Sequence, residues 1–303
     1  MGQQVCKPAI VVHGGAGSAR KNDDGCAHAA ALGLAQLRQG AGALEAVVAA
    51  VVAMEDDERY NAGTGSELSL DGSTIEMDAA IMDTTGRLGA VAGLRSVRNP
   101  VLVARAVADT PHHLLCGEGA LLFARRLGFG EYDPMTDKAR RSHAEMIDKL
   151  RSAQEAMPGK SNDDFARFWN YQAPASVAGL RGCDTVGAVA RDAGGHFAVA
   201  GSTGGSTPAL LGRVGDTPMI GSGFYAGRLG AIACTGIGEH ILRHLLAREV
   251  YGWIAEGMPL GDALQRGVDL FDPAIDIGLI GVTATEMATR ANRDMARAEV
   301  DHA

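Results

Sequence analysis

The chain alternates between stretches with a strand-like apolar period and stretches with a helix-like one. Short apolar or alternating runs predict strands at Pro8–His13, Thr74–Met82, Gly89–Gly93, Thr185–Arg191, His196–Ser202, Pro218–Gly221, Ala231–Thr235 and Ile275–Val282. Apolar residues at helical spacing predict helices at Cys26–Gln39, Ala43–Met54, Pro100–Asp109, Gly119–Leu127, Arg140–Met157, Gly238–Glu256 and Pro259–Leu270. Because strands and helices come in runs, not in strict alternation, we expect an α+β fold of sheets covered by helices.

The regular pattern is interrupted between Glu131 and Arg181. This stretch is polar and charged, and Pro158–Gly182 has no clear period. We interpret the segment 131–184 as a mobile linker. A well-patterned strand then begins abruptly at Thr185, and a Gly194–Gly195 turn predicts that it forms a hairpin with the next strand.

Composition narrows the class of protein. The chain has 303 residues, 46% hydrophobic and 21% charged, and a net charge of −8, which argues against a dedicated nucleic-acid or anionic-membrane surface. No apolar run reaches the ~18 residues of a membrane span. The N-terminus lacks the pattern of a signal peptide, and the five cysteines are scattered without a CxxC pair. We therefore expect a cytoplasmic protein in a reducing compartment.

The sequence motifs do not favour a nucleotide site, a catalytic zinc site or a serine-hydrolase site. The glycine pairs do not form a GxGxxG or a GxxxxGK[ST] motif, so nucleotide binding is disfavoured. His240 and His244 have the spacing of a zinc helix, but Ile-Leu-Arg lies between them without a catalytic glutamate. A GxSxG nucleophile elbow is also missing.

Thr185 remains as a candidate nucleophile. A threonine hydroxyl is a poor nucleophile unless a base lies beside it. Cleavage of the chain before Thr185 would create an α-amino group, with a pKa near ~8, next to the hydroxyl. A threonine at the start of a strand and after a disposable linker suits such a self-cleaving precursor. Position alone does not separate this interpretation from an ordinary strand-initiating threonine.

Several motifs in the same order resemble one family. They are VVHGGAG (Val11–Gly17), NAGTGS (Asn61–Ser66), EMDAAIMD (Glu76–Asp83), AVAGLRSVRNPVLVAR (Ala90–Arg105), DTVGAVARD, STGGSTPALLGRVGDTP (Ser202–Pro218), GSGFYA and CTGIGE (Cys234–Glu239). Together they resemble the plant-type L-asparaginase/isoaspartyl peptidase family of N-terminal nucleophile hydrolases, which includes the glycosylasparaginases. The resemblance implies a four-layer αββα sandwich. It also implies self-cleavage between Asp184 and Thr185 into an α subunit (1–184) and a β subunit (185–303), which remain one structural domain.

The resemblance assigns catalytic roles to five residues. Thr185 would be the nucleophile and, through its amino group, the base, and Thr203 would hydrogen-bond to it. Thr235 and Gly236 match the oxyanion hole. Asn61 matches a loop asparagine near the nucleophile.

It also implies binding sites. Arg213 and Asp216 match a clamp for the substrate. The planar guanidinium of Arg213 suits the α-carboxylate, and the carboxylate of Asp216 can accept hydrogen bonds from the α-ammonium. Gly236 and Gly238 belong to the same substrate site, with the Gly238 carbonyl facing the ammonium. No organic cofactor is implied. A structural sodium ion is implied through the main-chain carbonyls of Met54, Glu55, Asp57, Tyr60, Ala62 and Thr64.

The implied activity is hydrolysis of L-asparagine and isoaspartyl (β-aspartyl) dipeptides to L-aspartate. Small-molecule substrates, without nucleic acid or membrane partners, and a dimer of αβ pairs are implied with it. Three alternatives stay open: a glycosylasparaginase, a peptidase specific for cyanophycin-type dipeptides, and an inactive binding homologue. The chain departs from the family pattern in having aspartate at 184 and isoleucine at 237. It also departs after Val282, where Thr283–Ala303 is patterned as a helix.

Overall fold

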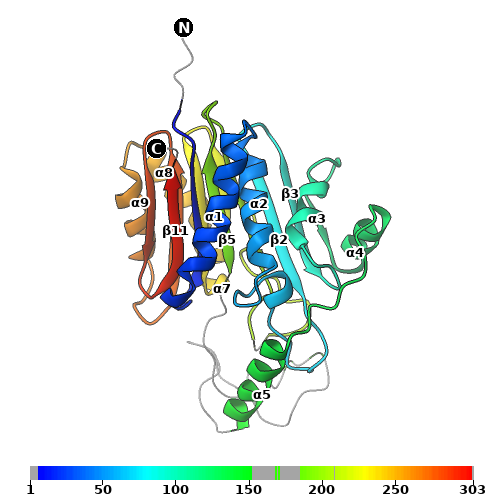
Figure 1. The fold of residues 1–303 in the computed structure, drawn as a ribbon. Helices are drawn as coiled ribbons and strands as arrows, with labels where there is room; N and C mark the ends of the chain where they lie inside the picture. Colours follow the sequence, from blue (N-terminus) through cyan, green and yellow to red (C-terminus); the bar gives the residue numbers. More distant parts are fainter. Residues whose placement is uncertain (1–5, 152–167, 169, 171–184, 208, 302–303) are drawn as a thin grey trace.

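Two β-sheets and the helices packed on them make up the molecule (Figure 1). The structure is a computed structural model and describes residues 6–151, 168, 170, 185–207 and 209–301. The mixed α+β class predicted from the sequence is confirmed. Most of the predicted linker, 131–184, lies outside the described residues, but its first part contains a helix, α5 (Asp137–Arg151).

The larger sheet has seven strands in the order β11-β1-β5-β6-β2-β3-β4. Neighbouring strands are antiparallel except β3 and β4, which are parallel. The strands are β1 (Ala9–Ala16), β2 (Met77–Asp83), β3 (Leu88–Leu94), β4 (Leu114–Cys116), β5 (Val186–Arg191), β6 (Phe197–Thr203) and β11 (Met295–Asp301). This topology brings the start of β5, the end of β6, the start of β2 and the ends of β3 and β4 to one end of the sheet.

The smaller sheet has four strands in the order β10-β9-β8-β7. They are β7 (Phe224–Gly227), β8 (Gly230–Gly236), β9 (Ile277–Thr283) and β10 (Met287–Ala291). Side chains of both sheets, among them Val11, Val199 and Ile280, form a shared buried core, and β5 contacts β8 and β9. Strands buried on both faces account for the nearly continuous apolar runs of β1 and β5.

Helices cover the other faces of the sheets. Helices α1 and α2 contact β1, α2 also contacts β5 and β6, and α3 packs on β2 and β3. Helix α8 contacts β8, and α9 contacts β9 and β10. The helices are α1 (Asp23–Arg38), α2 (Ala43–Glu55), α3 (Pro100–Val107), α4 (Gly117–Arg126), α7 (Gly238–His244), α8 (Leu246–Ala255) and α9 (Leu260–Val268), with short 3-10 turns at Arg20–Asn22 and Gly63–Gly65.

The prediction of a helix in the C-terminal segment 283–303 was wrong. Its residues form β10 and β11, and β11 pairs along β1, for example Val12 with Ala298. The segment is rich in alanine, arginine and glutamate, which favour helices when the chain is isolated. An unpaired edge of β1 offers a row of backbone hydrogen bonds, and strand formation depends on such partners more than on intrinsic preference.

Two other predicted elements also differ. Pro218–Gly221 is a turn with an isolated bridge at Ile220, and the strand begins three residues later, as β7. The long helix predicted at Gly238–Glu256 is divided by Leu245, which has a left-handed backbone (φ 46°). This break separates α7 from α8 and lets α8 turn onto the four-stranded sheet.

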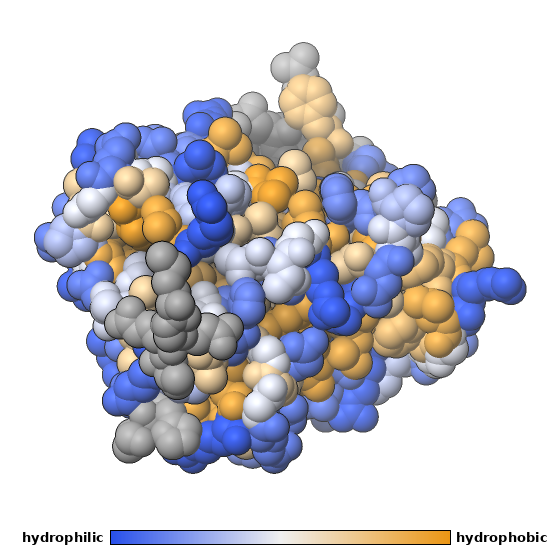
Figure 2. All heavy atoms as spheres, turned by 90° about the horizontal axis from the view of Figure 1, so that it is seen from above, coloured by the Kyte–Doolittle hydropathy of each residue, from blue (hydrophilic) through white to orange (hydrophobic). Residues whose placement is uncertain are grey.

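The two ends of the sheets differ. The start of β1 and the end of β11 lie at the top of Figure 1. Figure 2 shows the molecule from this side, where hydrophilic and hydrophobic side chains are mixed. The opposite end carries the start of β5 and the end of β6. Among the described residues, no helix is long and apolar enough to cross a membrane.

Candidate active site

Thr185 immediately precedes β5 at the lower end of the seven-stranded sheet. Its hydroxyl donates a hydrogen bond to the hydroxyl of Thr203, the last residue of β6, over 3.3 Å. The Thr203 oxygen also accepts a hydrogen bond from the Gly205 amide (3.2 Å). Both threonines are buried. Thr185 is therefore held by a hydroxyl that is itself oriented. Asp184, the other half of the predicted cleavage site, lies outside the described residues.

A small internal cavity of about 10 Å³ adjoins Thr185, with His13 and Cys234 also in its wall. That volume is close to the minimum for one water molecule, so it cannot hold a substrate. His13 is fully buried, and burial lowers its pKa to about 3, with the backbone of Thr185 acting in the opposite direction. His13 is thus neutral and poorly suited to accept a proton.

Thr235 and Gly236 end β8, on the second sheet. The Thr235 oxygen accepts a hydrogen bond from the Ala16 amide (3.2 Å), which leaves its O–H proton free to donate. Gly236 has a φ of +149°, and a Cβ there would overlap the carbonyl oxygen of Asp276. Only glycine fits at position 236, and its backbone amide directly follows Thr235 in the chain.

Arg213 is half-buried beside the same end of the sheets, and its charge is paired with Glu239. Its Nε and Nη2 donate to the two carboxylate oxygens of Glu239, at 2.9 and 2.8 Å. This two-point contact occupies one edge of the guanidinium and leaves further N–H donors on Nη1 and Nη2. Glu239 comes from the first turn of α7.

Asp216 is the least satisfied charged group of this region. Its side chain is buried, and within the described structure its Oδ2 has no hydrogen-bond partner. Burial raises its pKa to about 7, although nearby Arg213 acts in the opposite direction. A buried carboxylate without a partner costs free energy, so it is a natural receptor for a cation.

Gly238 lies between these two side chains. A Cβ at this position would come within 2.8 Å of both Arg213 Nη2 and Asp216 Oδ1. A Cβ at Gly223 would come within 2.9 Å of Asp216 Oδ2, and Gly223 also lines the small cavity at Thr185. The carboxylate therefore lies close to the proposed nucleophile. Glycine at these two positions lets the backbone pack closely against the charged groups.

Asn61 braces the loop that follows Thr203. Its Nδ2 donates to the Gly205 carbonyl (2.8 Å), its Oδ1 accepts from the Glu67 amide (3.0 Å), and its carbonyl accepts from the Gly204 amide (3.0 Å). Both functional groups of the side chain are engaged in the loop. Because Gly204 and Gly205 directly follow Thr203, these hydrogen bonds place Asn61 near Thr203.

The loop predicted to hold sodium is tightly folded. Gly63 has a φ of +52°, and a Cβ there would lie 2.6 Å from the Glu55 carbonyl oxygen. A Cβ on Gly65 would overlap the Tyr60 carbonyl oxygen. The glycines let carbonyls converge, and oxygen ligands of this kind suit a hard cation. The described residues contain no cluster of three His, Cys, Asp or Glu side chains that could hold a metal ion.

Comparison with known proteins identifies the family of the chain. The family model described as Asparaginase matches residues 6–301. The chain is 44% identical to a plant-type L-asparaginase of Thermococcus kodakarensis over 86% of this chain and 84% of that protein. It is 40% identical to an isoaspartyl peptidase/L-asparaginase of Xenopus laevis over 87% of this chain and 81% of that protein.

The chain belongs to the asparaginase family. The structure places two carboxylates near Arg213 that were not predicted from the sequence as site residues, Glu239 and Asp78. Glu239 directly follows Gly238 in CTGIGE and could have been found as a carboxylate adjacent to the clamp. Asp78 is buried, its Oδ1 accepts the Gly93 amide (2.8 Å), and burial raises its pKa to about 6, while Gly93 and Arg213 act in the opposite direction.

Proposed function

We propose that this protein is a self-processing threonine amidohydrolase that releases L-aspartate from L-asparagine and from β-aspartyl dipeptides. The observation that carries the proposal is the buried carboxylate of Asp216, which lies beside Arg213 and close to a threonine that heads a strand. Its Oδ2 has no hydrogen-bond partner among the described residues. The names of the relatives, L-asparaginase and isoaspartyl peptidase, describe the same chemistry.

The charged pair accounts for the aspartyl part of the substrate. The free N–H donors of Arg213 would bind the α-carboxylate. Asp216, assisted by the Gly238 carbonyl, would accept from the α-ammonium, and its missing hydrogen bond would then be made. Such recognition of both charges selects a free α-amino acid head group and leaves the β-carbonyl to face Thr185.

The reaction would proceed through an ester. The Thr185 oxygen attacks the β-carbonyl carbon while the hydroxyl proton passes to the Thr185 α-amino group. The Thr235 hydroxyl and the Gly236 amide would donate to the oxyanion, and Thr203 orients the nucleophile. The C–N bond breaks, and the leaving nitrogen takes the proton and departs as ammonia or an amine. Water then hydrolyses the ester, giving L-aspartate and free Thr185.

Self-processing would prepare the base. The Thr185 oxygen attacks the carbonyl carbon of Asp184, an ester replaces the peptide bond, and water hydrolyses this ester. The products are an α subunit of residues 1–184 and a β subunit of residues 185–303, still folded as one domain. Within the β subunit, Thr185 then carries a free amino group beside its hydroxyl.

Further features of the family are part of the same proposal. The two sheets with helices on their other faces would constitute the αββα sandwich of N-terminal nucleophile hydrolases. Carbonyls of Met54, Glu55, Asp57, Tyr60, Ala62 and Thr64 would hold a structural sodium ion. No reaction step would pass through this ion or an organic cofactor. The active assembly would be a dimer of αβ pairs.

Intact mass and product release test the function together. Purified protein is incubated beside a Thr185→Ala variant, and aspartate is measured with asparagine and β-Asp-Leu as substrates. We expect two fragments meeting at residues 184 and 185 and aspartate release in the unmodified protein only. The substitution should lower turnover by at least roughly 10³-fold, as nucleophile removal does in other hydrolases. An uncut chain that releases no aspartate would sink the proposal.

A further inference from the structure

Asp78 is a buried acid in an otherwise apolar stretch of β2. It lies between Met77 and Ala79 and is 2% exposed. A carboxylate in such a place is unfavourable unless polar partners stabilise it. No step of the hydrolysis proposed above uses this group, so the chemistry of the reaction does not explain why it is there.

A β-bulge in β3 supplies one partner. The pairing of β2 with β3 shifts register between Met77 and Ala79, so two residues of β3 lie opposite Asp78. One of them is Gly93, which has a φ of +59°, and its amide donates to Asp78 Oδ1 over 2.8 Å. Bulges of this kind redirect groups beside active sites. Here the bulge directs a backbone amide at the carboxylate.

The loop 212–216, which carries the proposed clamp, supplies the other partner. Burial raises the pKa of Asp78, while hydrogen bonding from the amides of Gly93 and Gly215 acts in the opposite direction. Gly215 is itself buried and lies two residues after Arg213 in the chain. The carboxylate of Asp78 therefore links β3 to the loop that carries the clamp.

Gly215 supports the guanidinium of Arg213. A Cβ at Gly215 would lie 2.7 Å from Arg213 Nη1 and 3.2 Å from its Cζ and Nη2. The guanidinium thus lies directly against this glycine, and a shift of Gly215 would move the donors that bind the α-carboxylate in the proposed function. The charges of Asp78 and Arg213 also attract each other.

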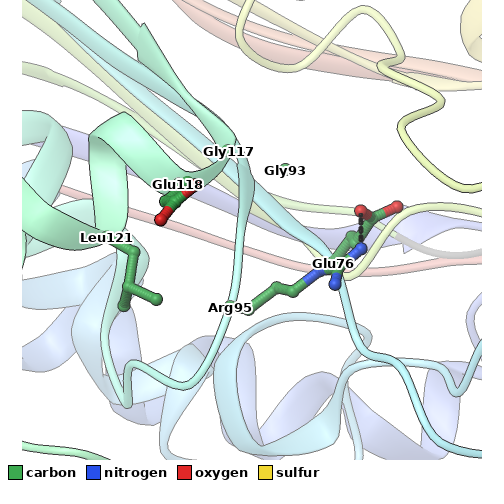
Figure 3. A pocket seen from close by; sticks show the side chains of 6 residues that line it. All are labelled: Glu76, Gly93, Arg95, Gly117, Glu118 and Leu121. Atoms are coloured by element: carbon green, nitrogen blue, oxygen red, sulfur yellow. Dashed lines mark hydrogen bonds and ion pairs between the residues drawn. The ribbon is translucent and has the colours of Figure 1, made fainter.

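Glu76, two residues before Asp78, holds the other side of the loop. Its Oε2 accepts the Gly212 amide over 2.7 Å, and its Oε1 pairs with Arg95 at 2.6 Å (Figure 3). Backbone amides before and after Arg213 thus bind carboxylates from one end of β2. Glu76 is partly exposed, whereas Asp78 is enclosed, and an enclosed charge interacts more strongly with its partners.

We infer that Asp78 is a positioning residue for the clamp. It fixes Gly215 against β3, and Gly215 in turn fixes the guanidinium of Arg213. The distance between Arg213 and Asp216 is thereby matched to the two charges of an aspartyl head group. The inference rests on the proposed function, in which Arg213 binds the α-carboxylate, and it assigns Asp78 an effect that passes through Arg213.

A double-mutant cycle tests this role. Asp78→Ala is made alone and together with Arg213→Lys, which keeps a positive charge and loses the planar guanidinium. Asp83→Ala is the matched control, since Asp83 is a buried aspartate at the far end of β2 that accepts the amides of Thr85 and Arg87. For each protein, kcat/KM with asparagine is measured per cleaved chain, together with Tm and the cleaved fraction by intact mass.

We expect Asp78→Ala alone to lower kcat/KM by about 10- to 100-fold, because misplacement of a binding group by about 1 Å has effects of this size. In the Arg213→Lys background the same substitution should lower kcat/KM by less than about threefold, since the guanidinium that Asp78 positions is absent. Asp83→Ala should lower Tm as Asp78→Ala does and leave kcat/KM within about twofold, because its site is independent of the clamp.

A conservative variant keeps the test open to failure. Asp78→Asn retains an oxygen that can accept the Gly93 amide, so its kcat/KM should lie between those of Asp78→Ala and the unmodified protein. If Asp78→Ala does not fold, Asp78→Asn takes its place in the cycle, with the same comparison between the two backgrounds.

The failures are distinguishable. If the loss is equally large in the Arg213→Lys background, the effect passes through another residue, such as Thr203 opposite Asp78 in the β2–β6 register, and the inference is wrong. It is also wrong if Asp83→Ala lowers kcat/KM as much, or if neither Asp78 variant lowers it. If the unmodified protein releases no aspartate from asparagine, the proposed function itself fails.

Discussion

Two regions at the end of the sheets that carries Thr185, the proposed nucleophile, are built differently. In the proposed clamp, Asp216 is buried, and Arg213 is half-buried and makes a two-point contact with Glu239. Gly238 packs closely against both side chains. A cavity of about 490 Å³ beside α4 is wide, and Glu118, in its wall, is exposed (Figure 3). Buried charges interact strongly because water does not screen them, whereas exposed ones contribute little. We therefore expect a ligand charge to be selected more strictly at Asp216 than at Glu118.

The largest effect should follow from Asp216→Asn, which removes the buried charge and preserves the shape. We expect kcat/KM for asparagine to fall by about 10²–10³-fold, because the substrate ammonium would lose a desolvated partner. Folding stability should not fall, because an unpartnered buried carboxylate is itself unfavourable. Asp262→Asn, on the exposed side of α9, is the control. A loss below fivefold would abolish the contrast between clamp and cavity.

A smaller effect should follow from Gly238→Ala. The added methyl group would come within 2.8 Å of both Arg213 and Asp216, so at least one of them must move. Misplacement of this kind costs roughly 10- to 100-fold in kcat/KM. Gly119→Ala is the matched control, because a Cβ there meets nothing within 4 Å. Equal activities of the two variants, measured with asparagine, would show that the clamp is not closely packed around its substrate.

The smallest change in rate should follow from Glu239→Gln, which keeps a hydrogen bond to Arg213 and removes a charge. The pKa of Asp216 is about 7, raised mainly by burial and further by Glu239. The ionised carboxylate binds the ammonium, so kcat/KM should fall as the pH drops below about 7. Loss of the Glu239 charge lowers this pKa.

The pH profile checks that expectation. In Glu239→Gln, the acid limb of kcat/KM should move to lower pH, while the rate at pH 8 changes by tenfold or less. The free Thr185 amino group also titrates, but Glu239→Gln should leave that limb in place. An unmoved acid limb would mean that Asp216 does not govern binding, and that its burial has no functional consequence at neutral pH.

Local pattern predicted much of the fold. The apolar run at Pro8–His13 became β1, and the helical period at Ala43–Met54 became α2, because strands and helices buried on one side or both leave a direct record in residue order. The C-terminal segment misled for the opposite reason. Its residues favour helix locally, but the free edge of β1 offers backbone partners that only the folded chain presents.

The site divides in the same way. Thr185 could be selected from its position at the head of a strand, and the family resemblance of the motifs then indicated Thr203, Arg213, Asp216 and Thr235. Glu239 could not be assigned as the partner of Arg213, because a contact between the 213 loop and α7 is not a local property of the chain. No sequence motif predicted the cavity beside α4. It arises where strands distant in sequence end side by side.

The sequence by itself determined the α+β class, the residues able to supply a nucleophile and a two-charge clamp, and the position of Thr185 at the head of a strand. The fold class and the position of Thr185 follow from residue type and spacing, and the clamp residues follow from the resemblance of the motifs to one family. Only the tertiary structure decided which charges are buried or unpartnered, that the C-terminus pairs with β1, and that the ends of β5, β6, β2, β3 and β4 form one row. Burial and strand order depend on contacts between residues far apart in the chain, and desolvation gives those contacts their energetic weight.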